Sequence, residues 1–160
     1  MALTLGSAIP DVELKTIRGG KPEAVRSGDV LGKGKVVLVA VPGAFTPTCS
    51  NIHLPGYVQR ADELFSKGVD TIACISVNDA WVMDAWGANQ GVGDKIVMLA
   101  DGNGEFTEAM GLAIDLSGGG LGRRSARYAA VIEDGVLTSL EVEEKPGVDA
   151  SSCDNVLTKV

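Results

Sequence analysis

The stretch RYAAVIEDGVLTSLEV, residues 127–142, has the pattern of two antiparallel strands joined by a tight turn. Apolar and β-branched residues occupy both halves, and Glu133, Asp134 and Gly135 lie between them. An Asp-Gly pair between two apolar runs favours a β-hairpin, because both residues tolerate the positive φ angles that a two-residue turn requires. We therefore expect the sheet of this protein to end in an antiparallel hairpin.

The residues before this hairpin alternate between apolar strands and amphipathic helices. Strands are predicted at 36–41, 69–77 and 95–101, and helices at 54–68 and 80–90. This order implies right-handed crossovers and a parallel sheet. A doubly wound nucleotide-binding fold would continue with parallel units, whereas parallel units that end in an antiparallel hairpin and a helix are thioredoxin-like. We therefore expect one α/β domain over residues 1–160 with a thioredoxin-like fold, in which a central mixed sheet has helices on both faces.

Three other segments carry weaker signals. Residues 1–35 are rich in turn formers, residues 102–112 predict a turn and a short helix, and residues 151–160 predict a final helix. The glycines of 115–125 predict a loop. They precede the final hairpin, so they are not the glycine turn that joins a first strand to its helix in nucleotide-binding proteins.

Composition excludes several kinds of partner. The chain has 160 residues, of which 14 are basic and 21 acidic, and the net charge of −7 repels nucleic acid and anionic lipid. No apolar run approaches the roughly 20 residues that span a bilayer, so we expect no membrane partner. Three widely spaced cysteines fit a reducing compartment better than a disulfide framework. We expect the cytoplasm, or a plastid or other organelle stroma if this is a processed mature form.

Cys49 falls on or near the first turn of the helix that follows the first buried strand. Unpaired backbone N–H groups and the helix dipole favour an anion there, and the thiolate is the nucleophilic form of a cysteine. Thr46 offers a hydroxyl three residues earlier, while Pro42 and Pro47 stiffen the loop. Thr46 also stands where a Cys-x-x-Cys motif would carry its first cysteine, which excludes dithiol exchange within this motif.

Other roles for Cys49 are possible. A lone cysteine beside a helix is often a packing residue. A zinc site would need four clustered ligands, and only His53 lies near Cys49 in the sequence. A protease-type Cys–His pair would need an oxyanion loop that the sequence does not show, and we interpret His53 as a structural hydrogen-bonding residue rather than a general base. The spacing P-x-x-x-T-x-x-C after a buried strand favours a reactive thiol over these alternatives.

The stretch VPGAFTPTCSNIHLPGY, residues 41–57, resembles the active-site loop of the type II peroxiredoxins, whose P-x-x-x-T-x-x-C motif matches Pro42, Thr46 and Cys49. The similarity extends through ACISVNDAWVMDAWG, LADGNGEF and LGRRSARYAAVIEDG, and plant-type members are the most similar. The resemblance implies that the Cys49 thiolate attacks the terminal oxygen of a peroxide. It also implies that the Thr46 hydroxyl and backbone N–H groups hold the peroxide, and that Arg127 stabilises the thiolate and the developing charge.

The resemblance further implies a homodimer that reduces hydrogen peroxide and alkyl hydroperoxides without a metal or organic cofactor. Glutaredoxin with glutathione, or thioredoxin, would then regenerate Cys49 from its sulfenic acid. Trp81 and Trp86 on one predicted helix are consistent with a dimer interface, although both could fill the monomer core. We interpret Arg123 and Arg124, which are close to Arg127 in the sequence, as surface charges.

The sequence offers two candidates for the resolving cysteine. Periodicity alone places Cys74 in a buried strand, but plant-type peroxiredoxins carry a second cysteine at this spacing, which makes Cys74 the first candidate. Cys153 is the weaker candidate, because its surroundings differ from those of the C-terminal cysteine in the mammalian form, and we expect it to be exposed or half-packed. Two other functions remain open, a redox-sensing binding module and an inert thioredoxin-like scaffold.

Overall fold

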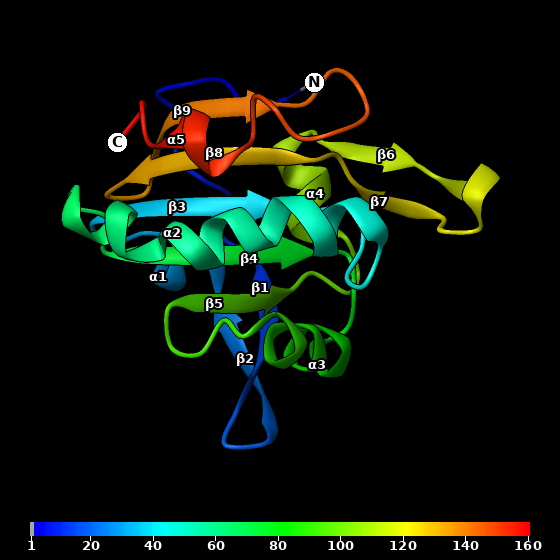
Figure 1. Cartoon of the computed structure of the whole chain (residues 1–160). Coiled ribbons are helices and arrows are strands. Elements are labelled where there is room, and N and C mark those ends of the chain that lie inside the picture. The colour runs from blue at the N-terminus through cyan, green and yellow to red at the C-terminus, as the bar shows by residue number, and fades with distance from the viewer. Residues whose placement is uncertain (1) are drawn as a thin grey trace.

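The structure is a computed structural model that describes residues 2–160. Within these residues one seven-stranded sheet has the order β2-β1-β5-β4-β3-β8-β9 (Figure 1). The strands are β1 Glu13–Arg18, β2 Lys21–Arg26, β3 Lys35–Ala40, β4 Thr71–Ser76, β5 Ile96–Ala100, β8 Tyr128–Glu133 and β9 Val136–Val142. The sheet is mixed: β3, β4 and β5 are parallel, and β8 runs antiparallel to both β3 and β9.

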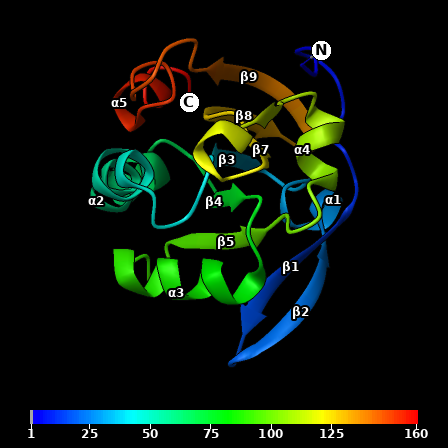
Figure 2. The ribbon, with the colours of Figure 1, turned by 90° about the vertical axis from the view of Figure 1, so that its right-hand side faces the viewer.

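Helices cover both faces of this sheet, which confirms the thioredoxin-like arrangement (Figure 2). One face carries α2 Leu54–Ser66, α3 Ala80–Gln90 and α5 Cys153–Val156, and the other carries α1 Ser27–Val30 and α4 Glu105–Met110. Successive residues of a strand point to opposite faces. Val37 and Val39 of β3 accordingly belong to the core under α2, and Val36 and Leu38 to the core under α4.

The final hairpin forms as its turn residues predict. Asp134 and Gly135 both have positive φ angles, 48° and 80°, which is the backbone of a tight turn whose twist matches that of the strands. Tyr128 pairs with Val142 and Glu133 with Val136, with one irregularity after Val131. On its other edge β8 pairs with β3, so the start of β8 lies beside the end of β3, where Ala40 pairs with Tyr128.

Two segments differ from the sequence-based expectation. Residues 13–26 form the hairpin of β1 and β2, although we expected only turns. All but one residue of β2 are exposed, so this edge strand lacks the apolar pattern that identifies a strand. The predicted loop at 115–125 is a small second sheet of β6 Ala113–Asp115 and β7 Arg123–Ser125, joined through a short turn of 3₁₀-helix, η2, at Ser117–Gly119. Its strands have only three residues each, too few to show a period.

The helices of the described residues are also informative about membranes. Among them, none combines the length and apolar character that a membrane-spanning helix requires.

Candidate active site

The loop after β3 turns sharply before it enters a helix. Thr46 donates to the Gly43 carbonyl oxygen through its N–H, at 3.3 Å, and through Oγ1, at 2.6 Å. Phe45 has a φ of 64°, which costs a non-glycine residue of order 1 kcal/mol or more. Helical backbone then begins at Pro47, where the missing N–H is not needed. The loop is therefore a tight, locally strained turn that delivers Cys49 into the first turn of a helix.

Neighbouring elements support this loop from two sides. Asn78 Oδ1, just after β4, accepts from the Ala44 N–H at 3.0 Å and from Ser76 Oγ at 2.7 Å. The next residue, Asp79, caps α3 by accepting from Val82 N at 2.9 Å. Asn78 is thus a site-supporting residue that sequence reasoning missed, because its partner is 34 residues away.

The two arginines of β7 have different surroundings. Arg123 is exposed and pairs with Glu108, as a surface charge would. Arg124 is half-buried, and it donates to the Leu121 carbonyl at 2.8 Å and to the Pro42 carbonyl at 3.4 Å. The interpretation of Arg124 as a surface charge is therefore wrong, because the β6–β7 hairpin folds it against the loop that carries Pro42.

Cys49 is completely buried, at 0% exposure, and opens a single π-helical turn, η1, over Cys49–His53. The Leu54 N–H closes this turn by bonding to the Cys49 carbonyl. Single π-turns within helices occur often at functional sites. Since water does not reach the thiol in this conformation, protein groups must stabilise any negative charge that it acquires.

Arg127 supplies such a group. It lies immediately before β8, and its Nη2 donates to Cys49 Sγ at 3.1 Å. Its Nη1 bonds to His53 Nδ1 at 2.9 Å. The guanidinium is permanently charged and planar, so two held N–H groups define its orientation. The structure thus brings Arg127 to Cys49, whereas Arg123 and Arg124 make no hydrogen bond to it.

His53 is held on both of its ring nitrogens. Its Nε2 lies 3.0 Å from the Ser151 carbonyl oxygen, which can only accept, so Nε2 carries the proton and Nδ1 accepts from Arg127. Burial and the positive charge of Arg127 lower the pKa of His53 to about 4. His53 is therefore neutral at physiological pH, and it acts as a hydrogen-bonding residue that orients Arg127.

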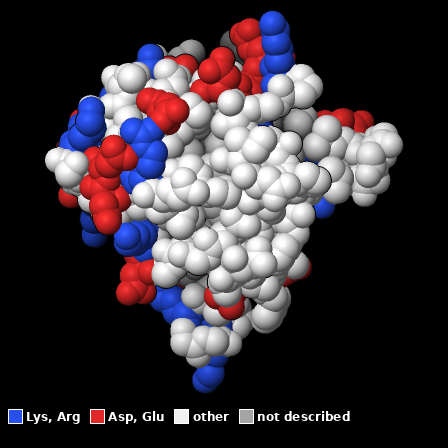
Figure 3. All heavy atoms as spheres, viewed as in Figure 1, with Lys and Arg blue, Asp and Glu red and all other residues white. Residues whose placement is uncertain are grey.

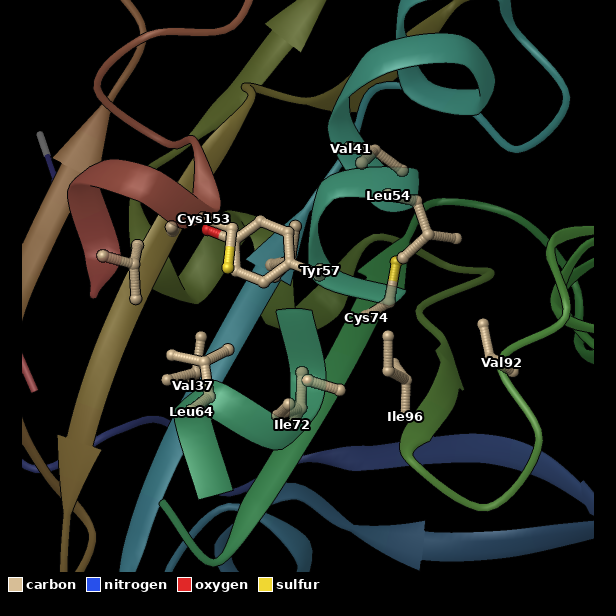
Figure 4. Close-up of a cluster of buried hydrophobic side chains, with 14 of the residues drawn as sticks. Val37, Val41, Leu54, Tyr57, Leu64, Ile72, Cys74, Val92, Ile96 and Cys153 are labelled. Carbon is tan, nitrogen blue, oxygen red and sulfur yellow. The ribbon is translucent and has the colours of Figure 1, made fainter. Parts of the chain in front are cut away.

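The other two cysteines are buried near Tyr57. Figure 4 shows Cys153 beside the Tyr57 ring and Cys74 on the other side of that ring, close to Leu54. Burial raises the pKa of Cys153 to about 11, and it raises the pKa of Cys74 further still. All three cysteines are free thiols. Cys153 is only 4% exposed, which corrects the expectation that it is exposed or half-packed, because α5 folds it against α2.

Known proteins resemble this chain along nearly its full length. A family model described as redoxin matches residues 4–157. The chloroplastic peroxiredoxin-2E of Arabidopsis thaliana is 46% identical over 160 residues, covering 98% of this chain and 68% of the relative. A peroxiredoxin of Synechocystis is 42% identical over 163 residues, and the match covers 94% of this chain and 86% of the relative.

A solved structure shows the same fold. Reduced Prx3 from Vibrio vulnificus in complex with hydrogen peroxide superposes with a TM-score of 0.92 at 46% identity, and the match covers 98% of this chain and 95% of that protein. With a family model that spans almost every residue, and with relatives in plants and bacteria above 40% identity, the chain belongs to the redoxin family and is a type II peroxiredoxin, a thiol-dependent peroxidase.

Proposed function

We propose that Cys49 is the nucleophile of this peroxidase and that hydrogen peroxide and alkyl hydroperoxides are its substrates. The thiolate sulfur attacks the terminal peroxide oxygen, so an S–O bond forms while the O–O bond breaks. Cys49 is oxidised to the sulfenic acid and keeps the terminal oxygen. The other fragment of the peroxide leaves as hydroxide or alkoxide and takes up a proton to become water or an alcohol. A thiol then attacks the sulfenic sulfur, releases water, and forms a disulfide that a second thiol reduces.

The observation that carries this proposal is the 3.1 Å contact between Arg127 Nη2 and Cys49 Sγ at the start of a helix. A fixed cation and unpaired N–H groups favour the thiolate, and the same groups stabilise negative charge that moves onto peroxide oxygen. Thr46 Oγ1 donates a hydrogen bond to the Gly43 carbonyl oxygen, so its lone pairs remain available to accept a hydrogen bond from a hydroperoxide. Pro42 completes the site by stiffening the loop and by giving its carbonyl to Arg124.

Replacement of Cys49 by serine tests this assignment. An alcohol at this position has far too high a pKa to become an anion, so Cys49→Ser should lose peroxide consumption with every thiol donor while its circular dichroism spectrum stays unchanged. Cys153→Ser, which also removes one buried thiol, is the matched control and should retain activity. Residual turnover above a tenth of wild type in Cys49→Ser would show that another group is the nucleophile.

We further propose that an external thiol, glutathione with glutaredoxin, competes well with an internal disulfide in regenerating Cys49, and that thioredoxin depends on Cys74. The raised pKa values of Cys74 and Cys153 support the external route, because protonated thiols attack a sulfenic acid slowly. The dependence of thioredoxin on Cys74 rests on the resemblance to plant-type members. External glutathione needs only local exposure of Cys49.

A reducing compartment fits this chemistry, and we propose the cytoplasm or a plastid stroma. Two relatives that are 46% identical are named as chloroplastic, and three widely spaced cysteines fit a reducing compartment better than a disulfide framework. We also propose that the chain acts as one domain over residues 1–160, since both cores pack on the same sheet.

A further inference from the structure

A carboxylate outside the site organises the turn that precedes α5. Glu143 directly follows β9, and its Oε2 accepts from Ser151 Oγ at 2.6 Å, from Ser151 N at 2.8 Å and from Asp149 N at 2.7 Å. Its Oε1 accepts from Ala150 N at 3.3 Å. One side chain therefore holds three consecutive residues of the turn. Partial burial opposes ionisation, but these bonds lower the pKa of Glu143, so the acceptor stays charged at neutral pH.

The turn presents a single carbonyl group to the active-site helix. The Ser151 carbonyl oxygen accepts from His53 Nε2 at 3.0 Å and from Tyr57 Oη at 2.5 Å. A carbonyl oxygen has two lone pairs, so both are used. Ser151 itself is 0% exposed, and water therefore cannot replace either bond without opening the turn. The position of this carbonyl decides where the His53 ring lies.

His53 in turn determines the position of Arg127. The Nη1–Nδ1 bond of 2.9 Å leaves Nη2 directed at Cys49 Sγ. Glu143 also contacts the backbone of Arg127, because the Glu143 N–H donates to the Arg127 carbonyl oxygen at 3.0 Å. The backbone and the guanidinium of Arg127 are thus both connected to Glu143, the first directly and the second through Ser151 and His53.

We propose that Glu143 is a positioning residue for the peroxidase centre, which acts through the Ser151 carbonyl and His53 to hold the Arg127 guanidinium against Cys49. The proposal rests on the catalytic role proposed above for Arg127. A long arginine side chain has many rotamers, and displacement of a catalytic group by about 1 Å can cost on the order of 10²-fold in rate. Glu143 touches neither thiol nor peroxide, so its effect must travel through these two residues.

The first test compares Glu143→Ala with Glu141→Ala in the full chain. Glu141 lies two residues earlier, in β9, and pairs with Lys159 at 3.4 Å, but it has no hydrogen bond to the 149–151 turn. We expect Glu143→Ala to slow single-turnover oxidation by hydrogen peroxide about tenfold. The pH profile of this rate should also differ from that of wild type, which a merely structural role would not require. Glu141→Ala should match wild type in both measurements.

The second test is a double-mutant cycle with Arg127→Gln. If Glu143 acts only through the guanidinium, the double variant Arg127→Gln/Glu143→Ala should be no slower than Arg127→Gln alone. A further tenfold loss in the double variant would overturn the proposal, and so would a wild-type rate in Glu143→Ala. Should Glu143→Ala fold poorly, Glu143→Gln keeps the size and one acceptor oxygen and should show a smaller loss with the same non-additivity.

The outcomes also separate this proposal from the one on which it rests. A slow Arg127→Gln variant with an unaffected Glu143→Ala variant would overturn the positioning role alone. A wild-type rate in Arg127→Gln would overturn the role of Arg127 and the positioning role together.

Discussion

At the scale of single residues, Arg127 and Cys49 are 78 positions apart in the chain and share a 3.1 Å contact. We expect Arg127→Gln to slow the reduction of hydrogen peroxide about 10²-fold, which is about 2.7 kcal/mol of transition-state stabilisation, with little change in Tm. Stopped-flow single turnover measures the rate. Arg123→Gln is the matched control, since Arg123 is exposed and pairs with Glu108. If Arg124→Gln causes the loss and Arg127→Gln does not, the assignment of the catalytic arginine is wrong.

His53 provides a prediction about pH and stability. Its pKa is about 4 in the folded protein and 6.5 for a free histidine, so between these values the unfolded chain binds more protons than the folded one. The contribution of neutral His53 to the free energy of unfolding is therefore fully present above about pH 6.5. It is lost as the pH falls toward 4, by about 3 kcal/mol in total. Urea unfolding of wild type and His53→Gln across this range measures the difference. Parallel stability curves for the two proteins would contradict the lowered pKa.

At the scale of elements, the position of Cys74 within β4 limits its reactivity. β4 is paired on both sides, with β3 and with β5, and its thiol is fully buried. A disulfide requires the two Cα atoms to approach to about 4.4–6.8 Å with suitable geometry. We expect any backbone movement that bonding to oxidised Cys49 requires to come from the η1 turn, since unwinding a helix end is cheaper than opening a central strand.

This reasoning predicts different effects for the two electron donors. Cys74→Ser should keep a substantial part of turnover with glutathione and glutaredoxin while it loses most turnover with thioredoxin. Cys153→Ser should change little in either assay, because its protonated thiol packs between α5 and α2. Peptide mass spectrometry after one equivalent of peroxide identifies the disulfides that form. A dominant Cys49–Cys153 bridge would reverse the ranking of the two cysteines.

At the scale of the whole molecule, one broad face carries almost no charge although the net charge is −7 (Figure 3). This face lies over the N-terminal part of α2 and over α3. Large exposed apolar residues are found in the active-site loop, the η1 turn and the start of α3: Phe45 at 51%, Ile52 at 58% and Trp81 at 64% exposure. Trp86, by contrast, fills the core and donates to Ser50 Oγ at 2.9 Å. We propose that this face is the homodimer interface.

Sedimentation velocity at micromolar concentration should therefore show a species of twice the 16.5 kDa monomer mass. Trp81→Asp should shift the population to monomer, because a charge buried in an apolar interface is not compensated. Leu5→Asp is the matched control, since Leu5 is 60% exposed but lies outside this set of residues. A wild-type protein that sediments only as monomer would contradict the proposed dimer.

The sequence by itself determined the features that depend on local order. The apolar runs of β3, β4 and β5, the Asp-Gly turn of the final hairpin and the position of Cys49 after a strand can all be recognised within a few residues, because burial, turn geometry and helix termini act over that range. Together with the P-x-x-x-T-x-x-C spacing, these features predicted the thioredoxin-like fold and the peroxiredoxin family.

Only the tertiary structure decided which distant groups surround the thiol. The bonds from Arg127 to His53, from His53 to Ser151 and from Ala44 to Asn78 join residues 74, 98 and 34 positions apart, and no local period encodes such pairs. They exist because the sheet register sets the start of β8 beside the end of β3, and because the segment after β9 folds back over α2. The exposed strand β2 was missed for a related reason. It is a strand because it pairs with β1, and its mostly exposed side chains show no apolar alternation that would predict a strand.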